Sequence, residues 1–200
     1  MTHKLLVATH NRGKVAELAD MLQHLAIDWL TLDDAGVTLD VAETGATFRE
    51  NAILKATAYA QLTGLLTLAD DSGLEVDALQ GAPGVYTARY GGTGLTPVQR
   101  YEYLLANLAG VPWTERTARF RCVVALAQPA GLRGTAEGTC EGLIALTPAG
   151  NHGFGYDPVF YVAEKGVTMA ELPAEVKHQI SHRGRAVAAL LPRLRQVLAE

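Results

Sequence analysis

The sequence has little cysteine, no long hydrophobic run and no excess of positive charge. Its 200 residues include two cysteines, Cys122 and Cys140, which form no CxxC motif or ligand cluster. Their spacing permits a disulfide, but two buried free thiols are the preferred interpretation. The N-terminal residues lack the apolar stretch of a signal peptide. No run approaches the roughly 18 apolar residues of a membrane span, so we expect a cytoplasmic protein.

The charge balance argues against a general polyanion-binding protein. Lysine and arginine total 17 against 21 aspartates and glutamates, a formal net charge of −4. No global positive field would therefore attract nucleic acid or an anionic membrane. A nucleotide site needs only a few local basic residues, so a small anionic ligand is not excluded. The hydrophobic fraction of 48% argues against disorder.

The pattern of apolar residues predicts an α/β protein. The length suits one domain over residues 1–200, or two closely joined lobes around a single core. Short apolar runs predict strands at 5–8, 65–69, 117–127 and 134–145, with a turn at 129–131. Helices are predicted at 13–23, 47–63, from 96 onwards, and at 183–198. Thr47 and Glu50 form a capping box in this prediction. Helix-connected strands early and a hairpin late indicate a mixed sheet.

A polar segment separates the first predicted strand from the first predicted helix, and it consists of Thr9, His10, Asn11, Arg12, Gly13 and Lys14. A phosphate here would meet free backbone N–H groups at a helix N-terminus, where the helix dipole favours an anion. Thr9 and Asn11 would add side-chain donors, and Lys14 a mobile positive charge. The segment is not a P-loop, because GxxxxGK[ST] is absent. An ordinary polar turn explains it equally well.

Two consecutive carboxylates, Asp70 and Asp71, follow a short apolar run and precede Ser72 and Gly73. Oxygen ligands suit Mg²⁺, which takes one or two carboxylates together with waters and phosphate oxygens. The alternative is an Asx turn whose carboxylates cap backbone groups. Small residues at 81–84 would allow a ligand close to the backbone, which favours a functional site. Because successive residues leaving a strand point to opposite faces, we expect the two carboxylates to act differently.

Glu43, Asn51 and Lys55 form a further candidate group. Asn51 and Lys55 are four residues apart, so they share one face of the predicted helix. That face would matter if it points at the phosphate that Lys14 contacts. The alternative is a solvated lysine.

Two later segments carry aromatic and basic side chains. In the first, Phe154 is flanked by glycines and could stack on a base, at roughly 1–3 kcal/mol by analogy with single-strand binders. Asp157 could accept hydrogen bonds from ring N–H groups, although a glycine-rich turn with a core aromatic is an equal alternative. In the second, Ser181 would cap the last helix and place His182 and Arg183 in its first turn. Positive charge opposes the dipole there, a local conflict typical of functional sites, unless this is a surface basic cluster.

Other hydrolytic chemistries find no support. The sequence has no GxSxG nucleophile elbow, no HExxH motif and no context for a cysteine nucleophile, and its six histidines show no regular metal-ligand spacing.

The order and composition of these blocks resemble the inosine triphosphate pyrophosphatase family, the XTP/dITP diphosphatases. The resemblance rests on residues 8–14, 43–56, 69–74, 81–90, 153–160 and 180–183, which span nearly the whole chain. His10 departs from the glycine that many members carry, which affects the local turn. The resemblance implies an elongated α/β fold with a long central mixed β-sheet flanked by helices, two lobes around an active-site cleft, and a homodimer.

The same resemblance implies an activity and the residues that perform it. The expected reaction is Mg²⁺-dependent hydrolysis of ITP, dITP and XTP to the monophosphate and pyrophosphate, which cleanses the nucleotide pool. Asp71 would be the catalytic proton acceptor and would bind Mg²⁺ together with Glu43. Lys55 and residues 9–14 would hold the triphosphate. The remaining substrate-binding residues, several of them near the base, would be Ser72, Phe154, Gly155, Tyr156, Asp157, Lys177, His182 and Arg183.

A donor such as Arg183 or His182 would favour the six-carbonyl of hypoxanthine or xanthine over the amino group of adenine.

Two competing interpretations remain. One is a nucleotide pyrophosphatase of different base preference, like the septum-formation-inhibitor relatives. The other is a non-catalytic nucleotide- or RNA-binding module, which the acidic balance and the carboxylate pair disfavour.

Overall fold

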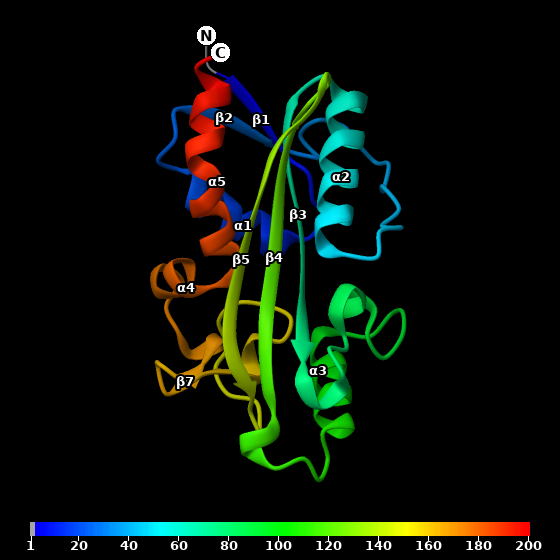
Figure 1. Ribbon diagram of the computed structural model, residues 1–200, viewed down its shortest axis with the longest axis vertical. Coiled ribbons are helices and arrows are strands. Elements are labelled where there is room, and N and C mark those ends of the chain that lie inside the picture. Colours follow the sequence, from blue (N-terminus) through cyan, green and yellow to red (C-terminus); the bar gives the residue numbers. More distant parts are fainter. Residues whose placement is uncertain (1–2) are drawn as a thin grey trace. The chain divides into compact units, whose positions relative to one another are not determined.

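The computed structural model in Figure 1 describes residues 3–200, and these contain a seven-stranded sheet in the order β2-β1-β3-β4-β5-β6-β7. Strand β1 (His3–Val7) runs parallel to β2 (Ile27–Thr31) and to β3 (Leu66–Val76). Strand β6 (Phe160–Val162) runs antiparallel to β5 (Gly131–Ile144) and to β7 (Val167–Thr168). A short turn joins β4 (Thr117–Gln128) to β5. The predicted mixed α/β sheet is confirmed.

The helices match most of the sequence predictions. They are α1 (Arg12–Leu22), α2 (Phe48–Thr63), α3 (Pro97–Asn107), α4 (Ala174–Ile180) and α5 (His182–Leu198). Helix α4 and the strands β2, β6 and β7 were not predicted, because each is too short to show a clear period. None of the helices in the described part of the chain is long and apolar enough to cross a membrane.

The start of α2 shows half of the predicted capping box. The Thr47 hydroxyl oxygen accepts from the backbone N–H of Glu50 at 3.1 Å, as predicted. The prediction for the second bond of the capping box is wrong. The Glu50 carboxylate accepts from Ala46 N–H at 2.7 Å rather than from Thr47 N–H. The helix ends at Gly64, whose left-handed φ of 73° lets its N–H bond to Ala60 O. Glu50 therefore holds the loop that precedes α2 through a hydrogen bond to its backbone.

The predicted end of the strand before the acidic pair is wrong. Strand β3 does not end at Ala69 but continues through Asp70 and Asp71 to Val76. The prediction failed because carboxylates are rare inside strands, where sequence patterns favour β-branched and aromatic residues. Placement inside a strand has a consequence for the two side chains, because consecutive strand residues project to opposite faces of a sheet.

The chain divides into two compact units. Unit 1 comprises the described residues up to Asp71 with Cys122–Gly138 and Arg183–Glu200, and unit 2 comprises Ser72–Arg121 with Thr139–His182. Each unit has a core of its own. In unit 2 the core gathers around Phe120 and Phe160, whose ring centroids lie 4.4 Å apart. Cys122 and Cys140 are buried free thiols, as predicted.

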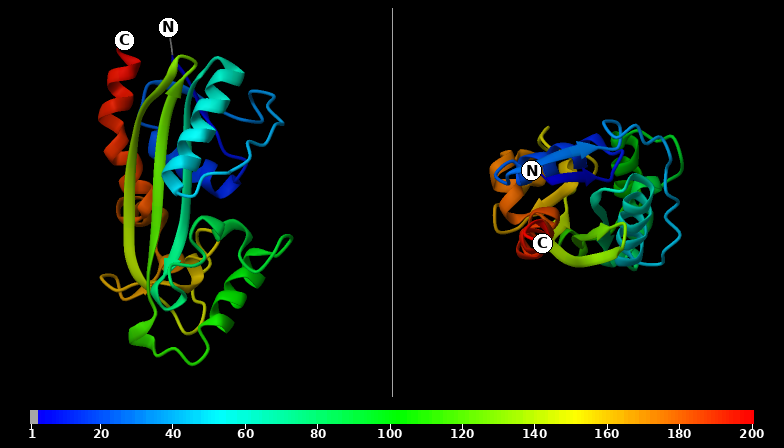
Figure 2. Two further views of the ribbon diagram at one scale, coloured as in Figure 1. Left: turned by 45° about the vertical axis from the view of Figure 1, so that its right-hand side comes forward. Right: turned by 90° about the horizontal axis from the view of Figure 1, so that it is seen from above.

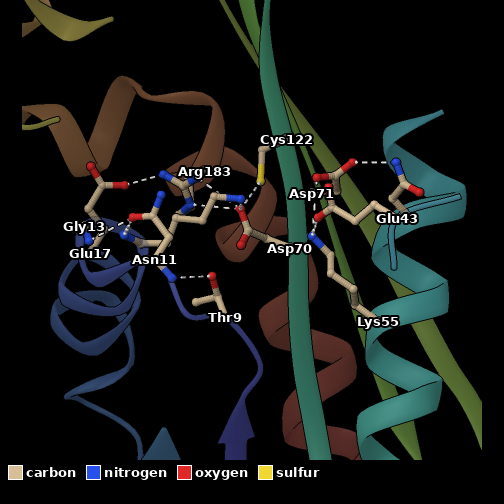
Figure 3. Close-up of polar contacts among 12 residues, drawn as sticks. Thr9, Asn11, Gly13, Glu17, Glu43, Lys55, Asp70, Asp71, Cys122 and Arg183 are labelled. Atoms are coloured by element: carbon tan, nitrogen blue, oxygen red, sulfur yellow. Dashed lines mark hydrogen bonds and ion pairs between the residues drawn. The ribbon is translucent and has the colours of Figure 1, made fainter. Parts of the chain in front are cut away.

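Unit 1 is layered around its strands. Apolar residues of α1 and α5 pack with Leu5, Val7 and Leu68 in one core. The two views of Figure 2 and the close-up in Figure 3 show α2 on the other side of β3 from α5. Each face of β3 at the acidic pair is therefore covered by different helices.

Candidate active site

Asp70 and Asp71 point to opposite sides of β3 (Figure 3). Asp70 faces α1 and the first turn of α5, and Asp71 faces α2. The expectation that the two side chains point to opposite faces is thus confirmed, and the cause is the twofold alternation of a strand.

Asp71 lies among three side chains of the α2 side. Its Oδ1 is 3.3 Å from Lys55 Nζ, and its Oδ2 accepts from Asn51 Nδ2 at 3.2 Å. Lys55 Nζ also donates to Glu43 Oε1 at 2.6 Å. Asn51 and Lys55 share one helix face, as predicted, and that face points at Asp71. This group is called the Asp71 cluster below and consists of Glu43, Asn51, Lys55 and Asp71.

The Asp71 cluster combines two carboxylates with one ammonium group in a largely buried place. Burial raises the pKa of Asp71, and the positive charges of Lys55 and Lys14 oppose that rise without cancelling it. For Lys55, burial would lower the pKa, but the nearby charges of Asp71, Asp70 and Glu43 raise it overall. Lys55 therefore stays a cation, and Asp71 takes up a proton more readily than an exposed aspartate does.

Asp70 lies among cations on the other face of β3. Its Oδ2 is 3.0 Å from Lys14 Nζ and 3.0 Å from a terminal nitrogen of Arg183. The Cys122 thiol points at the same oxygen, with Sγ 3.8 Å away. Arg183, whose side chain is 1% exposed, also bonds to the Glu17 carboxylate. We call Lys14, Glu17, Asp70 and Arg183 the Asp70 network.

The pKa of Asp70 is held well below its usual range. Burial alone would raise it, but the charges of Lys14, Arg183 and Lys55 outweigh that effect. The same carboxylate, together with burial, raises the pKa of the Cys122 thiol to about 12. Asp70 is consequently a fixed anion, and Cys122 is an unreactive thiol.

The polar segment at residues 9–14 differs from its prediction in one respect. Asn11 Oδ1 accepts from the N–H groups of Gly13 and Lys14, at 2.9 and 3.2 Å, and so caps α1. Thr9 Oγ1 accepts from Asn11 N–H at 3.2 Å. The expected free backbone donors are thus bonded to side chains, because an Asn at this position satisfies them locally. The side chains of His10, Asn11 and Arg12 are exposed.

The predicted nucleotide-contact residues at 154–157 lie in unit 2. Asp157 Oδ2 accepts from Phe154 N–H at 2.8 Å and forms a buried ion pair with Lys177. Lys177 Nζ lies 5.0 Å from the centre of the Phe154 ring. Gly153 makes this approach possible, because a Cβ there would lie 2.1 Å from Asp157 Oδ2. Two distant motifs of the sequence therefore meet in one buried ion pair.

The other predicted nucleotide-contact residues occupy separate places. The Tyr156 hydroxyl donates to Thr87 O at 3.1 Å, and burial raises its pKa. His182 stacks on Phe120, with centroids 4.7 Å apart and an interplanar angle of 17°. Its neighbour Arg183 belongs to the Asp70 network instead. Gly155 has a left-handed φ of 62°, and Ser72 is half-buried on β3.

The Asp71 cluster suits a divalent cation. Among residues 3–200 there is no group of three or more His, Cys, Asp or Glu side chains able to hold a metal. Glu43 and Asp71 nevertheless both approach a single cationic group, Lys55 Nζ. Two carboxylates are within the number that Mg²⁺ takes from protein, with waters and phosphate oxygens completing its shell. The residues present therefore fit Mg²⁺.

The sequence did not reveal that Glu17 is buried, or that Arg183 pairs with Glu17 and Asp70. Glu17 is a buried carboxylate on α1, and its partner is 166 positions away in the chain. A glutamate between apolar residues on a helix is a weak signal of a buried ion pair, since charged residues are rarely buried without a partner.

Comparisons with known proteins identify the family of this chain. The model of the Ham1 family matches residues 5–193. The chain belongs to the Ham1 family. A dITP/XTP pyrophosphatase of Geobacter sulfurreducens is 52% identical over 187 residues, 94% of each chain. The resemblance drawn from the motifs is confirmed.

Solved structures of the Ham1 family share the fold. A HAM1 protein from Coxiella burnetii has a TM-score of 0.87 and 40% identity, covering 98% of this chain and all of its own. A nucleoside-triphosphatase, named as a dITP/XTP pyrophosphatase, from Mycobacterium abscessus has a TM-score of 0.75 and 45% identity, covering 94% and 99%. The similarity therefore extends over nearly the full length of each protein.

Proposed function

We propose that this protein hydrolyses ITP, dITP and XTP to the nucleoside monophosphate and pyrophosphate, with Mg²⁺ as cofactor. The observation that carries the proposal is the Asp71 cluster, a buried carboxylate with a raised pKa beside a lysine and a second carboxylate. Relatives about half identical to this chain are named dITP/XTP pyrophosphatases, which supports the same reaction here. Removal of such nucleotides would cleanse the pool used for DNA and RNA synthesis.

Lysines and the first turn of α1 hold the triphosphate in this proposal. Lys14 and Lys55 supply positive charge, and the side chains of residues 9–12, of which 10–12 are exposed, supply hydrogen bonds. Their charge offsets the repulsion between phosphate oxygens and an incoming water, and it stabilises the leaving pyrophosphate.

Glu43 and Asp71 would hold Mg²⁺ through carboxylate oxygens. The bound ion would neutralise charge on the phosphate oxygens and so lower the barrier to nucleophilic attack. Lys55 contacts both carboxylates and so holds them near each other.

Asp71 orients the attacking water and accepts its proton. A carboxylate of raised pKa is a better proton acceptor near neutral pH, and such general-base action contributes roughly 10²–10⁴-fold to a rate. The nucleophilic oxygen then bonds to phosphorus, and pyrophosphate leaves with the bridging electron pair.

Residues of unit 2 would contact the nucleotide base. Phe154 offers an aromatic face, and Lys177 and His182 offer donors that favour a six-carbonyl over the amino group of adenine. Gly155, Tyr156 and Asp157 shape the segment that carries Phe154. Contacts of Ser72 and Arg183 with the nucleotide stay predictions, as do the homodimer and the cytoplasmic location.

A substrate panel tests the proposal. Purified protein with Mg²⁺ is given dITP, XTP, ATP, GTP and modified pyrimidine triphosphates, and the products are identified by ³¹P NMR. We expect much faster hydrolysis of dITP and XTP than of ATP or GTP, with pyrophosphate as the product and no turnover after chelation of Mg²⁺. Release of orthophosphate alone would refute the reaction, and equal rates for all purines would refute the specificity.

A further inference from the structure

Asn51 is the one member of the Asp71 cluster without a role in the reaction described above. It is 2% exposed and lies in the first turns of α2. Its side-chain amide makes two hydrogen bonds in opposite directions. Oδ1 accepts from Gly45 N–H at 2.7 Å, and Nδ2 donates to Asp71 Oδ2 at 3.2 Å.

The two partners fix the orientation of this amide. Gly45 N–H is a donor and must face the amide oxygen, whereas the Asp71 carboxylate is an acceptor and must face the NH₂ group. Neither a carboxylate nor an apolar side chain of the same shape can satisfy both partners. Asparagine is therefore required at this position for a reason that helix formation does not supply, since its helix propensity is modest.

Gly45 belongs to the loop that carries Glu43. Residues 37–47 form neither helix nor strand. Side chains of α2 hold this loop at several points: Tyr59 OH accepts from Val41 N–H at 3.2 Å, Lys55 binds Glu43, and Asn51 binds Gly45. The position of Glu43 thus depends on α2.

The contact at Gly45 leaves no room for a side chain. A Cβ on Gly45 would lie 2.7 Å from Asn51 Oδ1 and 2.7 Å from Glu50 Cβ. Real Cβ atoms do not approach other atoms so closely, so any substitution of Gly45 pushes the loop away from Asn51. The amide bond and the glycine form one fitted contact.

We propose that Asn51 is a positioning residue that joins the loop at residues 37–47 to Asp71. It thereby holds the carboxylates of Glu43 and Asp71 where both can bind the same cation. Through Gly45 it fixes the loop, and through Asp71 Oδ2 it fixes the rotation of the catalytic carboxylate. Its neutral amide does this without adding charge beside the two carboxylates. The inference rests on the proposed function, because it concerns the same reaction.

The test measures two quantities for each variant. One is kcat for dITP at saturating Mg²⁺ and nucleotide, together with KM. The other is the hydrogen-exchange rate of the Gly45 amide by NMR, which reports the loop contact independently of activity. Asn51→Leu removes both bonds, and Asn51→Asp keeps an acceptor for Gly45 but presents an oxygen to Asp71.

For Asn51→Leu we expect kcat to fall by roughly 10–100-fold, the range for groups that orient metal ligands, with little change in KM. Exchange of the Gly45 amide should become faster. For Asn51→Asp, kcat should fall while Gly45 exchange stays slow. The matched control is Thr57→Val on the same helix, whose hydroxyl bonds to Ile53 O and Leu54 O of its own helix. It should change neither quantity.

Gly45→Ala approaches the same contact from the loop side and decides the matter if Asn51→Leu does not fold. It should lower kcat and speed exchange in the residues next to it. Wild-type kcat, within about twofold, in the folded variants would overturn the proposal, even if exchange became faster, because the bond would then be merely structural. A lower kcat for Asn51→Leu with unchanged Gly45 exchange would also overturn it. Failure of the proposed function is a separate result, seen in the wild-type protein alone.

Discussion

The two faces of β3 at Asp70 and Asp71 differ in what surrounds an identical side chain. On one face Asp70 is fully enclosed by Lys14 and Arg183, and its pKa is lowered. On the other face Asp71 meets one lysine, an amide and a second carboxylate, and its pKa is raised. One carboxylate is stabilised as an anion by compensating charge, whereas the other keeps the capacity to bind a proton or a cation.

Residues that are adjacent in a strand face different surroundings, so their side chains can take different roles. Different helices lie on the two faces of β3 (Figure 3). Asp70 faces α1 and α5, whereas Asp71 faces α2. Asp70 contributes to stability and to the position of Lys14. In the proposed function, Asp71 contributes to chemistry.

The largest effect is expected from Asp71→Asn. The amide cannot accept the proton of the attacking water, so kcat for dITP should fall by roughly 10²–10⁴-fold. The protein should remain folded, because Lys55 keeps Glu43 as a carboxylate partner at 2.6 Å. Steady-state kinetics and circular dichroism check both statements. Activity like that of the wild type would refute the assigned role.

On the other face, Asp70→Asn should mainly reduce stability. It leaves the fully buried Arg183 with Glu17 as its carboxylate partner and removes the partner of Lys14. Breaking a buried ion pair from one side costs roughly 3–5 kcal/mol in free energy of unfolding. Urea unfolding measures this loss. If Asp70→Asn were as stable as Asp71→Asn, the contrast between the faces would be wrong.

Glu43→Gln tests whether Glu43 helps to bind Mg²⁺ on the Asp71 face of β3. The variant keeps a hydrogen-bond acceptor for Lys55 but loses a negative charge. A charge-assisted contact is worth roughly 1.5–3 kcal/mol, so the Mg²⁺ concentration for half-maximal rate should rise at least about tenfold. A titration of rate against Mg²⁺ at fixed dITP provides the measurement. An unchanged Mg²⁺ requirement would remove Glu43 from the metal site.

The smallest effect is expected from Glu137→Gln, a control for ion pairs in general. Glu137 accepts from Arg49 of α2, and both side chains are well exposed. Exposed ion pairs contribute about 0–1 kcal/mol, so the free energy of unfolding should change by no more than that. Chemical denaturation under the conditions used for Asp70→Asn gives a direct comparison. A loss as large as that of the buried pair would show that burial is not the cause.

Local features of the fold were predictable from the sequence. Thr47 and Gly64 mark the ends of α2, and their caps depend on residues within a few positions. The alternation of side chains along a strand placed Asp70 and Asp71 on opposite faces. The helix period placed Asn51 and Lys55 on one face, and both reach Asp71.

Features that depend on distant parts of the chain were not predictable. Strand β3 continues through Asp70 because Arg183 and Lys14 compensate the buried charge, and Arg183 lies 113 positions away. The pairing of Arg183 with Glu17 likewise has no local signal. Glu43 stands on a loop without periodicity, so its approach to Lys55 becomes visible only in three dimensions.

The neighbouring carboxylates of β3 have opposite electrostatic environments, and carboxyl ¹³C NMR of the metal-free protein tests this difference directly. An unperturbed aspartate has a pKa of about 3.9. We predict that Asp71 titrates above this value and that Asp70 remains ionised below it, for as long as the protein stays folded. A midpoint for Asp71 at or below the unperturbed value, or an ordinary titration of Asp70, would contradict the account.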